Sequence, residues 1–564
     1  MVNQMETNKA KLKLSNKVID SNVIHSKTVS TKSLTHGLLP TPVKYSKLDM
    51  YLNGYNKVFR NYLVSGFKNG FSLQNESFTS NDSDKVLSSA KLRPDIVDKK
   101  LHKELLSGRL SGPFDISPYS DPVFSPLGLV PKKMPGEYRV IHHLSYPPGT
   151  SINDGIPRSE ATVKYTSIGQ AIKYIVSFGP NCYLAKSDIQ SAFRIIPISP
   201  SDYHLLGFKW KNQCYFDRCL PMGASSSCAI FERFSSAIEW IVKNFISNTV
   251  VLHVLDDFLF ISPNLNDCQS SLRIFLRLCS EIGIPISDEK TVGPYQILPF
   301  LGIQLNTITM SASLPPDKIL KFGRLIVQFL SSSSVTLKEL QSLNGMLNFA
   351  CGIIVPARAF CRRLYNLSQG LTKSYYKVKI TKAVKADLQV WKMFLLEYNN
   401  KTFFLDYKWL RSDILKLETD AASTIGFGAR FGSKWFAGVW DKKCLRLNIA
   451  LLELYPIYIA LVIWVQFFSN KCINILSDNM SVVHILNNFT SKEDNIMIIL
   501  RLLVLHCMKN NILIRSTHIC GRENKIPDML SRQQVQQALE LDQLLEKEPT
   551  LVPLHLQLQK LLGI

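Results

Sequence analysis

The sequence predicts a multidomain protein that combines α/β and α+β parts. Its 564 residues suffice for roughly three or four domains, and a hydrophobic fraction of 46% is typical of a globular chain with several cores. Alternating strand and helix signals run to about residue 306, a mainly helical stretch covers 337–367, and a second α/β unit covers about 414–532. Acidic residues end predicted strands in both α/β parts, so the fold and the function are predicted from the same segments.

The charge balance favours a polyanionic partner. The chain has 66 Lys and Arg against 44 Asp and Glu, a net charge of +22, which suits nucleic acid or an anionic membrane surface. Its 12 cysteines are scattered without the Cys-x-x-Cys spacing of zinc or redox sites, so we expect reduced thiols in an intracellular protein that is not secreted. The N-terminus lacks the continuous apolar core of a secretory signal.

The N-terminal part is predicted to lead into the first α/β unit. Residues 1–47 are basic and polar, and we expect a disordered tail there. Residues 48–112 place aromatic side chains at helix-like spacing and predict a helical lead-in. Residues 113–308 form the first α/β unit, which begins with two strands joined by a basic turn at Lys132 and Lys133.

Asp256 and Asp257 stand between two apolar runs that predict a hairpin, so both carboxylates fall at its tip. Asp188 ends a predicted strand upstream, at the edge where open sheets gather ligands. Metal ions such as magnesium are hard cations that prefer oxygen ligands, and transfer of a phosphoryl group to a sugar hydroxyl commonly uses two of them.

Strand alternation limits this site. Neighbouring strand residues face opposite ways, so Asp256 and Asp257 share a site only if the hairpin tip relaxes that alternation, and Asp188 and Asp256 are therefore the stronger candidate ligands. Taken alone, an Asp-Asp pair is more simply explained as a polar turn.

Five segments, in order, resemble the motifs of reverse transcriptases: 188–193, 220–223, 255–257, 283–290 and 300–302. Within that class, the sequence segments at 125–133 and 151–157 are most similar to the polymerases of DIRS-like retrotransposons, which are mobilised by a tyrosine recombinase. The resemblance covers roughly residues 48–532. It implies a right-hand polymerase, with fingers and palm in 113–308 and a helical thumb and connection in 309–410.

The resemblance also implies roles for residues near the incoming nucleotide. Asp188, Asp256 and Asp257 would bind two magnesium ions, for which manganese could substitute. Phe193 would lie beneath the incoming sugar, where its ring leaves no room for a 2′-hydroxyl; the alternative is a simple core ring.

The other implied nucleotide contacts are Arg139, Lys132, Lys133, Met222, Gly223 and Lys290. Arginine suits forked phosphate contacts and lysine a point charge. A solvated turn explains Lys132 and Lys133 almost as well, and Lys290 is explained equally well as a surface lysine. Two departures from the family pattern, Val254 in place of a common Tyr and Met222 in place of a common Gln, put primer placement and fidelity in question.

Residues 411–535 form a second predicted α/β unit, in which successive elements supply four acids. Asp420 and Asp478 end strands, Glu453 lies in an apolar helix, and Asp528 stands at a helix start. Each alone could be an ordinary helix cap or a solvated acid. Their order resembles ribonuclease H, which implies two metal ions that direct water at an RNA phosphodiester. His518, ten positions before Asp528, matches a family histidine that would assist product release or proton movement, and its alternative is a polar strand-end residue.

Two C-terminal segments remain. The apolar run at 449–468 could be a membrane span, but burying the Glu453 carboxylate in lipid would be costly. A buried helix with one functional Glu explains the same sequence pattern. Residues 536–564 are predicted to form an amphipathic tail.

The predicted function is RNA-directed DNA polymerisation with ribonuclease H activity. The implied partners are an RNA template, a DNA primer, an RNA–DNA hybrid and deoxynucleoside triphosphates, with no membrane and with a separately encoded recombinase as one further partner. The competing interpretation is a decayed or domesticated nucleic-acid-binding protein that retained the fold. We expect a cytoplasmic or nuclear location.

Overall fold

A four-stranded antiparallel sheet, which we call the palm sheet, lies at the centre of the first α/β unit. The computed structural model describes residues 39–132, 136–398, 402–403, 416–469, 471–510 and 512–564. The palm strands lie in the order β7-β8-β4-β9, with β4 at Tyr183–Asp188, β7 at Val250–Val254, β8 at Asp257–Ser262 and β9 at Val292–Tyr295. Lys133 and most of the predicted N-terminal tail lie outside the described residues.

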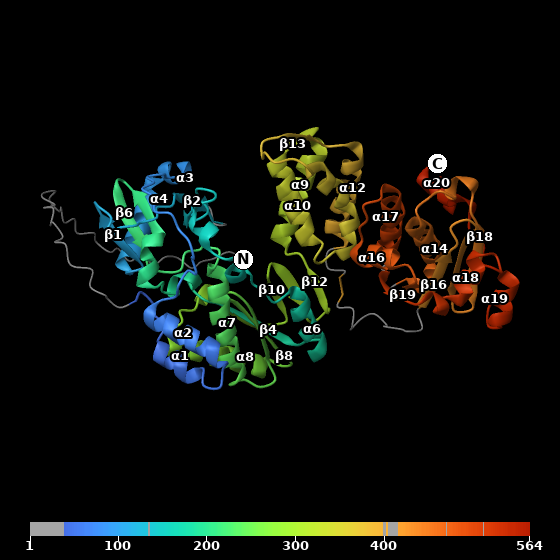
Figure 1. The fold of residues 1–564 in the computed structure, drawn as a ribbon. Coiled ribbons are helices and arrows are strands. Elements are labelled where there is room, and N and C mark those ends of the chain that lie inside the picture. Colours follow the sequence, from blue (N-terminus) through green and yellow to red (C-terminus); the bar gives the residue numbers. More distant parts are fainter. Residues whose placement is uncertain (1–38, 133–135, 399–401, 404–415, 470, 511) are drawn as a thin grey trace, which may run out of the picture. The chain divides into compact units, whose positions relative to one another are not determined.

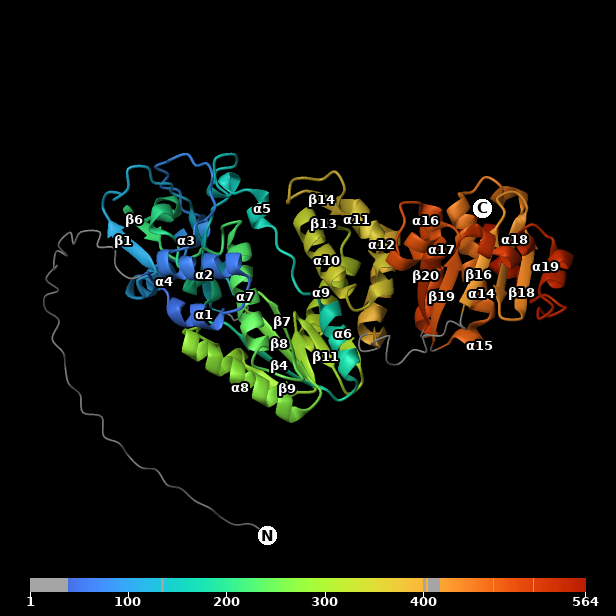
Figure 2. The ribbon, with the colours of Figure 1, turned by 60° about the horizontal axis from the view of Figure 1, so that its bottom comes forward.

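Three helices flank the palm sheet: α6 (Ile168–Phe178), α7 (Ser227–Lys243) and α8 (Leu265–Ile282). Phe258 and Phe260 of β8 belong to the same hydrophobic cluster as α7 and α8, whereas Leu259 and Ile261 pack with α6. This alternation follows from the two-residue period of a strand. Figures 1 and 2 accordingly show α7 and α8 on one side of the sheet and α6 on the other.

The part that we call the fingers precedes the palm strands and is partly inserted between them. The helices of this N-terminal region are α1 (Tyr45–Tyr51), α2 (Lys57–Asn69), α3 (Ser88–Lys91), α4 (Pro94–Leu106) and α5 (Arg158–Ala161). Its strands are β1 (Leu110–Phe114), β2 (Leu127–Pro131), β3 (Tyr138–His142), β5 (Gly207–Trp210) and β6 (Gln213–Asp217). β2 and β3 pair antiparallel, which confirms the predicted hairpin, and β1-β6-β5 form a second sheet.

A mainly helical part follows the palm, and we call it the thumb and connection. Its helices are α9 (Pro316–Ser331), α10 (Leu337–Ala350), α11 (Arg362–Ser368) and α12 (Lys382–Met393), and its strands are β10 (Ile297–Phe300), β11 (Ile303–Asn306), β12 (Ser311–Ser313), β13 (Ser334–Thr336), β14 (Lys377–Lys379) and β15 (Thr402–Phe403). Thr336 and Glu339 cap each other's backbone N–H groups at the start of α10, as a capping box does.

The C-terminal part contains a five-stranded mixed sheet in the order β18-β17-β16-β19-β20. Its strands are β16 (Lys416–Ala421), β17 (Gly426–Phe431), β18 (Lys434–Val439), β19 (Cys472–Ser477) and β20 (Leu513–His518), and its helices are α14 (Ile449–Ile463), α15 (Val465–Phe468), α16 (Met480–Asn488), α17 (Asp494–Lys509), α18 (Lys525–Ser531), α19 (Val535–Leu541) and α20 (Leu558–Leu562). β16, β17 and β18 are antiparallel, whereas β19 and β20 run parallel to β16.

Helices cover both faces of this sheet. The ring of Phe427 in β17 lies 5.0 Å from the ring of Tyr455 in α14. A Cβ atom on the next residue, Gly428, would lie 2.5 Å from the Cβ of Leu530 in α18, so a glycine lets α18 approach the opposite face. This ribonuclease H-like arrangement, together with the polymerase-like first part, confirms the predicted fold class.

The apolar run at 449–468 forms two helices, α14 and α15, that meet at Trp464. Glu453 is 9% exposed within α14. None of the helices in the described ranges is long and apolar enough to cross a membrane.

The predicted C-terminal tail packs against the mixed sheet and α14. The Tyr455 hydroxyl donates to the carbonyl of Leu556 (3.0 Å), and the Trp435 indole N–H donates to the carbonyl of Glu546 (2.6 Å). Leu545, Leu556 and Leu558 are buried, so these leucines complete a core.

A largely buried ion-pair cluster joins three segments of the fingers and palm. Arg194, in the 3₁₀ turn Ala192–Ile195, donates to Glu104 of α4 (2.9 Å) and to Asp217 of β6 (2.7 Å), and Arg109 also pairs with Glu104 (2.9 Å). Burial disfavours the charge on Arg194, but Asp217 and Glu104 outweigh it and raise the pKa of its guanidinium. Removing Arg194 would leave two partly buried carboxylates without this neutralising charge.

We expect Arg194→Met to destabilise the protein by about 3–5 kcal/mol, because one partner of a buried pair is lost. Arg60→Met, which breaks a half-exposed pair with Asp49, should cost only about 0–1 kcal/mol. Thermal unfolding of the two variants measures the difference, and equal midpoints would contradict the assigned role of Arg194.

Candidate active sites

The predicted hairpin tip lies directly beside the end of β4. Asp257 is paired in register with Asp188 across the β4–β8 ladder, and the N–H of Ile189 donates to the carbonyl of Asp256 (3.1 Å). Leu255, just before the pair, has φ of +54°, a left-handed conformation that is uncommon outside glycine. The tip therefore departs from regular strand geometry. Such a departure is the condition under which Asp256 and Asp257 can share a site, because neighbouring residues of a regular strand face opposite ways.

The three carboxyl groups interact electrostatically. Burial, followed by the nearby Asp188 and Asp257, raises the pKa of Asp256 to about 6. Burial and the proximity of Asp188 also raise the pKa of Asp257. Because desolvation and like charge both favour the neutral acid, the ionised cluster requires a compensating cation.

Lys290 supplies part of this compensation. Its Nζ lies 2.7 Å from Oδ2 of Asp188, and the N–H of Ser287 donates to the Asp188 carbonyl (2.9 Å). The surface lysine considered from the sequence thus reaches the carboxylate cluster, although its side chain remains 60% exposed. Contact with a leaving pyrophosphate stays a prediction.

The donor set suits a hard divalent cation, since it consists of carboxylate oxygens crowded by their own charge. Within the described ranges, no group of three His, Cys, Asp or Glu side chains is spaced so that it could hold a metal ion. Metal binding at Asp188, Asp256 and Asp257 therefore rests on the chemistry of the donors and on their coupling.

The predicted nucleotide contacts lie on several elements. Lys132 pairs with Glu137 (3.0 Å) across the β2–β3 turn, and Arg139 is exposed on β3. A Cβ atom on Gly223 would lie 2.5 Å from the carbonyl oxygen of His142 at the end of β3, so only glycine allows this approach. Met222 is 51% exposed.

Phe193 is half-buried, with its ring 5.3 Å from the ring of Phe231 in α7. Such a ring has one packed part and one accessible part, which is compatible both with contact to a sugar and with the core alternative. The neighbouring Arg194 cluster fixes the turn that carries it.

The second acid set converges at the carboxyl ends of β16 and β19, two interior strands of the C-terminal sheet. Burial and the charges of Asp420 and Asp478 raise the pKa of Glu453 to about 8. Burial raises the pKa of Asp420, a hydrogen bond from Ser531 opposes this, and the charges of Asp478 and Asp528 add to the rise. All four predicted acids are thus coupled, and they too form a donor set suited to hard cations.

The surroundings of these acids are polar. Asn479 Nδ2 donates to Glu453 (3.4 Å), and Arg532 Nε donates to Asp528 (2.8 Å). His518 is exposed at the end of β20, and its Nε2 lies 3.2 Å from the carbonyl oxygen of Asp478. The structure therefore places His518 beside the acids, and its role in the reaction stays a prediction.

Several supporting residues were not predicted from the sequence. Arg194, Glu232, Glu239 and Ser531 act through contacts between distant segments, and each has an ordinary local explanation. His253 did carry a signal, since it is a lone imidazole within the apolar run that precedes Asp256.

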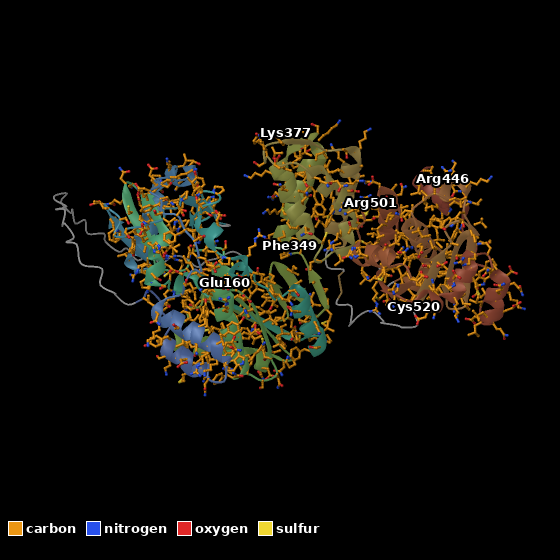
Figure 3. All side chains as sticks on the ribbon, in the orientation of Figure 1. Glu160, Phe349, Lys377, Arg446, Arg501 and Cys520 are labelled. Carbon is orange, nitrogen blue, oxygen red and sulfur yellow. The ribbon has the colours of Figure 1, made fainter. Side chains whose placement is uncertain are left out.

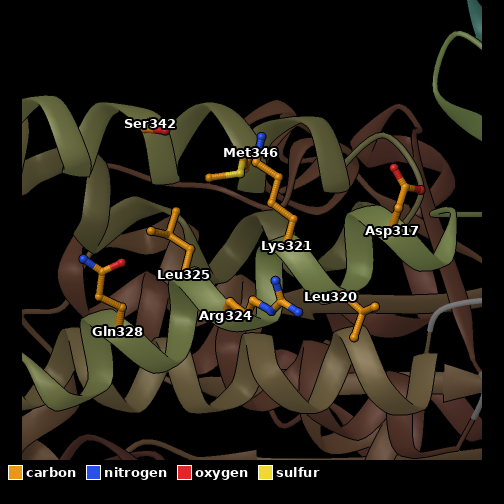
Figure 4. Close-up of a pocket in the computed structure, with 8 residues that line it drawn as sticks. All are labelled: Asp317, Leu320, Lys321, Arg324, Leu325, Gln328, Ser342 and Met346. Carbon is orange, nitrogen blue, oxygen red and sulfur yellow. The ribbon is translucent and has the colours of Figure 1, made fainter. Parts of the chain in front are cut away.

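A groove between α9 and α10 combines basic and apolar side chains. Figure 4 shows its lining residues: Asp317, Leu320, Lys321, Arg324, Leu325, Gln328, Ser342 and Met346. Lys321 extends toward Met346, and Lys321 and Arg324 are exposed. Nearby, Nζ of Lys318 lies 3.9 Å from the centre of the Phe349 ring, which is labelled in Figure 3. Two exposed cations and several apolar side chains thus share this surface.

Part of the chain is similar to known proteins. Curated relatives include the Gag-Pro-Pol polyprotein of Human T-cell leukemia virus 2, which is 26% identical over 264 residues, or 45% of this chain and 16% of that protein. The Pro-Pol polyprotein of Feline foamy virus is 27% identical over 216 residues, or 38% and 18%. Protein P of Duck hepatitis B virus (strain China) is 27% identical over 164 residues, or 29% and 20%. Each match thus spans at most a fifth of the relative's length.

Among solved structures, a foamy viral protease-reverse transcriptase in complex with double-stranded DNA has a TM-score of 0.48 and 16% identity, covering 84% of this chain and 81% of that one. The same kind of protein with an RNA/DNA hybrid has a TM-score of 0.47 and 17% identity, covering 84% and 62%. The family model described as "Reverse transcriptase (RNA-dependent DNA polymerase)" matches residues 130–305, which include Asp188, Asp256 and Asp257. Residues 130–305 of this chain therefore form a reverse transcriptase domain.

Proposed function

We propose that the chain is an RNA-directed DNA polymerase joined to a ribonuclease H. The observation that carries the proposal is the meeting of Asp188, Asp256 and Asp257 at the end of the palm sheet within a reverse transcriptase domain. Divalent ions bound there, magnesium or manganese, would activate the primer hydroxyl and stabilise the leaving oxygen. The protein's part is to hold the carboxylates in place.

Positively charged and ring-bearing side chains would position the nucleotide. Arg139 and either Lys132 or Lys133 would bind the triphosphate, and Lys290 would neutralise charge near the leaving group. Phe193 would select deoxynucleotides by excluding a 2′-hydroxyl. Met222 and Gly223 would lie close to the incoming base and sugar, where Gly223 permits close approach of the fingers.

The proposed ribonuclease activity rests on Asp420, Glu453, Asp478 and Asp528. These acids would hold two metal ions, and the bound ions would direct water at an RNA phosphodiester. His518 would assist proton movement or product release. Copying RNA into DNA leaves a hybrid, so an activity that removes the RNA strand is chemically complementary to the first.

The proposed partners are an RNA template, a DNA primer, their hybrid and deoxynucleoside triphosphates. The net charge of +22 favours such polyanions. The motif segments at 125–133 and 151–157 favour a DIRS-like retrotransposon origin with a separately encoded tyrosine recombinase. The scattered cysteines favour an intracellular location.

Asp256→Asn and Asp478→Asn should separate the two activities. Asp256→Asn is expected to abolish extension of a DNA primer on an RNA template, because it removes a ligand charge, and to leave hybrid cleavage. Asp478→Asn should do the reverse. Primer extension and cleavage of labelled hybrid measure the two activities on the same preparations, with a DNA template run in parallel.

The reciprocal design supplies its own folding control, since each variant must retain the other activity. Extension that survives Asp256→Asn would refute the assigned palm site. A wild-type chain that binds nucleic acid but neither extends primers nor cleaves hybrid would favour the decayed or domesticated binding protein.

Charge reversal in the α9–α10 groove should weaken duplex binding. The variant Lys321→Glu/Arg324→Glu is expected to raise the Kd for a primer–template and to reduce its salt dependence, because two phosphate contacts are lost. Fluorescence anisotropy at several salt concentrations measures both quantities. Lys57→Glu/Lys103→Glu, at two exposed positions on α2 and α4, carries the same charge change, and an equal loss in both variants would show a general charge effect.

Glu453 should make the metal-free protein less stable at alkaline pH. Its folded pKa of about 8 exceeds the usual value of about 4.3, so between these values the folded state keeps a proton that the unfolded state loses. Stability therefore falls as pH rises through this window. In chelator, Glu453→Gln should raise the thermal midpoint at pH 8.5 and leave it unchanged near pH 4.5.

Glu418→Gln is the matched control, because Glu418 lies on β16 with its side chain 26% exposed and Arg430 3.9 Å away. Glu418→Gln should not raise the thermal midpoint at pH 8.5. If Glu453→Gln raises the thermal midpoint equally at pH 8.5 and pH 4.5, charge repulsion is not the cause of the increase.

A further inference from the structure

Two glutamates of α7 enclose a histidine of the palm sheet. Glu232 and Glu239 are seven residues apart, about two helical turns, and therefore lie on one face of the helix. Oε1 of Glu232 lies 3.1 Å from Nε2 of His253, and Glu239 contacts Nδ1 of the same ring. His253 is 5% exposed, so this is a largely buried arrangement of charges.

The same Glu232 also reaches the hairpin tip. Its second oxygen, Oε2, accepts a hydrogen bond from the backbone N–H of Leu255 (3.2 Å). Leu255 is the residue with φ of +54°, and Asp256 and Asp257 follow it directly. A non-glycine residue persists in this conformation only where its surroundings hold it, and the Glu232 carboxylate is one such contact.

The histidine is a cationic partner for this carboxylate. Burial alone would lower the pKa of His253, but Glu232 and Glu239 outweigh it and raise the pKa to about 9. An ionised carboxylate is a stronger acceptor for a backbone N–H than a neutral group. The ring of His253 also stacks on Phe258, with centroids 5.5 Å apart, which fixes its position beside the tip.

We propose that Glu232 is a positioning residue: through the N–H of Leu255 it holds the Asp256–Asp257 tip in the conformation that binds divalent cations. This inference rests on the proposed function of the palm site. A purely structural ion cluster would stabilise α7 against β7 without affecting cation affinity, so affinity distinguishes the two roles.

The test is Mn²⁺ titration of the full chain followed by electron paramagnetic resonance, with the palm component defined as the binding lost in Asp256→Asn. Glu232→Ala removes both the ion pair and the acceptor, and it should weaken palm binding about 10-fold or more, as loss of a ligand-orienting group does. Glu232→Gln keeps an amide oxygen for the Leu255 N–H and should fall between wild type and Glu232→Ala.

Glu160→Gln is the matched control. Glu160, labelled in Figure 3, pairs with Arg233 of α7 (2.9 Å), one residue from Glu232. It should bind Mn²⁺ like the wild type. If Glu232→Ala does not fold, the Mn²⁺ affinities of Glu232→Gln and Glu160→Gln still test the proposal. Equal affinities of these two variants would overturn it.

Thermal midpoints in chelator and primer extension complete the experiment. A lower midpoint for Glu232→Ala with unchanged Mn²⁺ affinity would make the cluster structural and overturn the inference alone. Wild type that binds Mn²⁺ at the Asp256-dependent site without extending primers would refute the proposed polymerase while leaving the affinity comparison decisive. Absence of that Mn²⁺ site in wild type would refute both.

Discussion

Repulsion between partly buried carboxylates is the constraint on which the rest of this structure depends. Three acids meet at the palm tip and four at the carboxyl ends of interior strands of the C-terminal sheet, and in both places burial and like charge raise carboxyl pKa values. Such clusters oppose folding unless protons or cations neutralise them. Their presence at strand ends in both parts is easier to explain by function than by stability.

Both sites have nearby groups that partly offset the repulsion between the carboxylates. At the palm, Lys290 pairs with Asp188, and the ion cluster around Glu232 and His253 fixes the backbone that presents Asp256. At the second site, Arg532 pairs with Asp528, and Ser531 donates to Asp420. These contacts leave carboxylate oxygens available for cations, because each acid bonds to few protein donors.

Much of this arrangement could be predicted from local sequence. Asp188 ends β4, Asp420 is the next-to-last residue of β16, and Asp478 directly follows β19, so all three acids lie within one residue of a strand end, as the sequence predicted. The ordered motifs gave the fold class, since they specify both elements and sequence separation. The basic β2–β3 hairpin was likewise evident from a short pattern of strand and turn residues.

The remaining features depend on contacts between segments that lie far apart in the sequence. The register that pairs Asp257 with Asp188 joins strands about 70 residues apart in the sequence. Arg194 likewise forms an ion pair with Glu104, 90 residues earlier in the chain. Nothing local distinguishes Glu232 from a solvated helix acid, and the C-terminal leucines do not reveal that they pack on the mixed sheet. The supporting residues were therefore less predictable than the acids that they hold.

This difference bears on Val254, the departure that raised doubt about primer placement. Val254 pairs with Asp257 across the β7–β8 ladder, so replacing an aromatic side chain there changes the surface beside the acids and leaves their backbone intact. The conformation of the tip instead follows from Leu255, whose N–H is held by Glu232. The residue type at 254 should accordingly influence how a primer end is seated, whereas the affinity for cations should depend on the contact from α7.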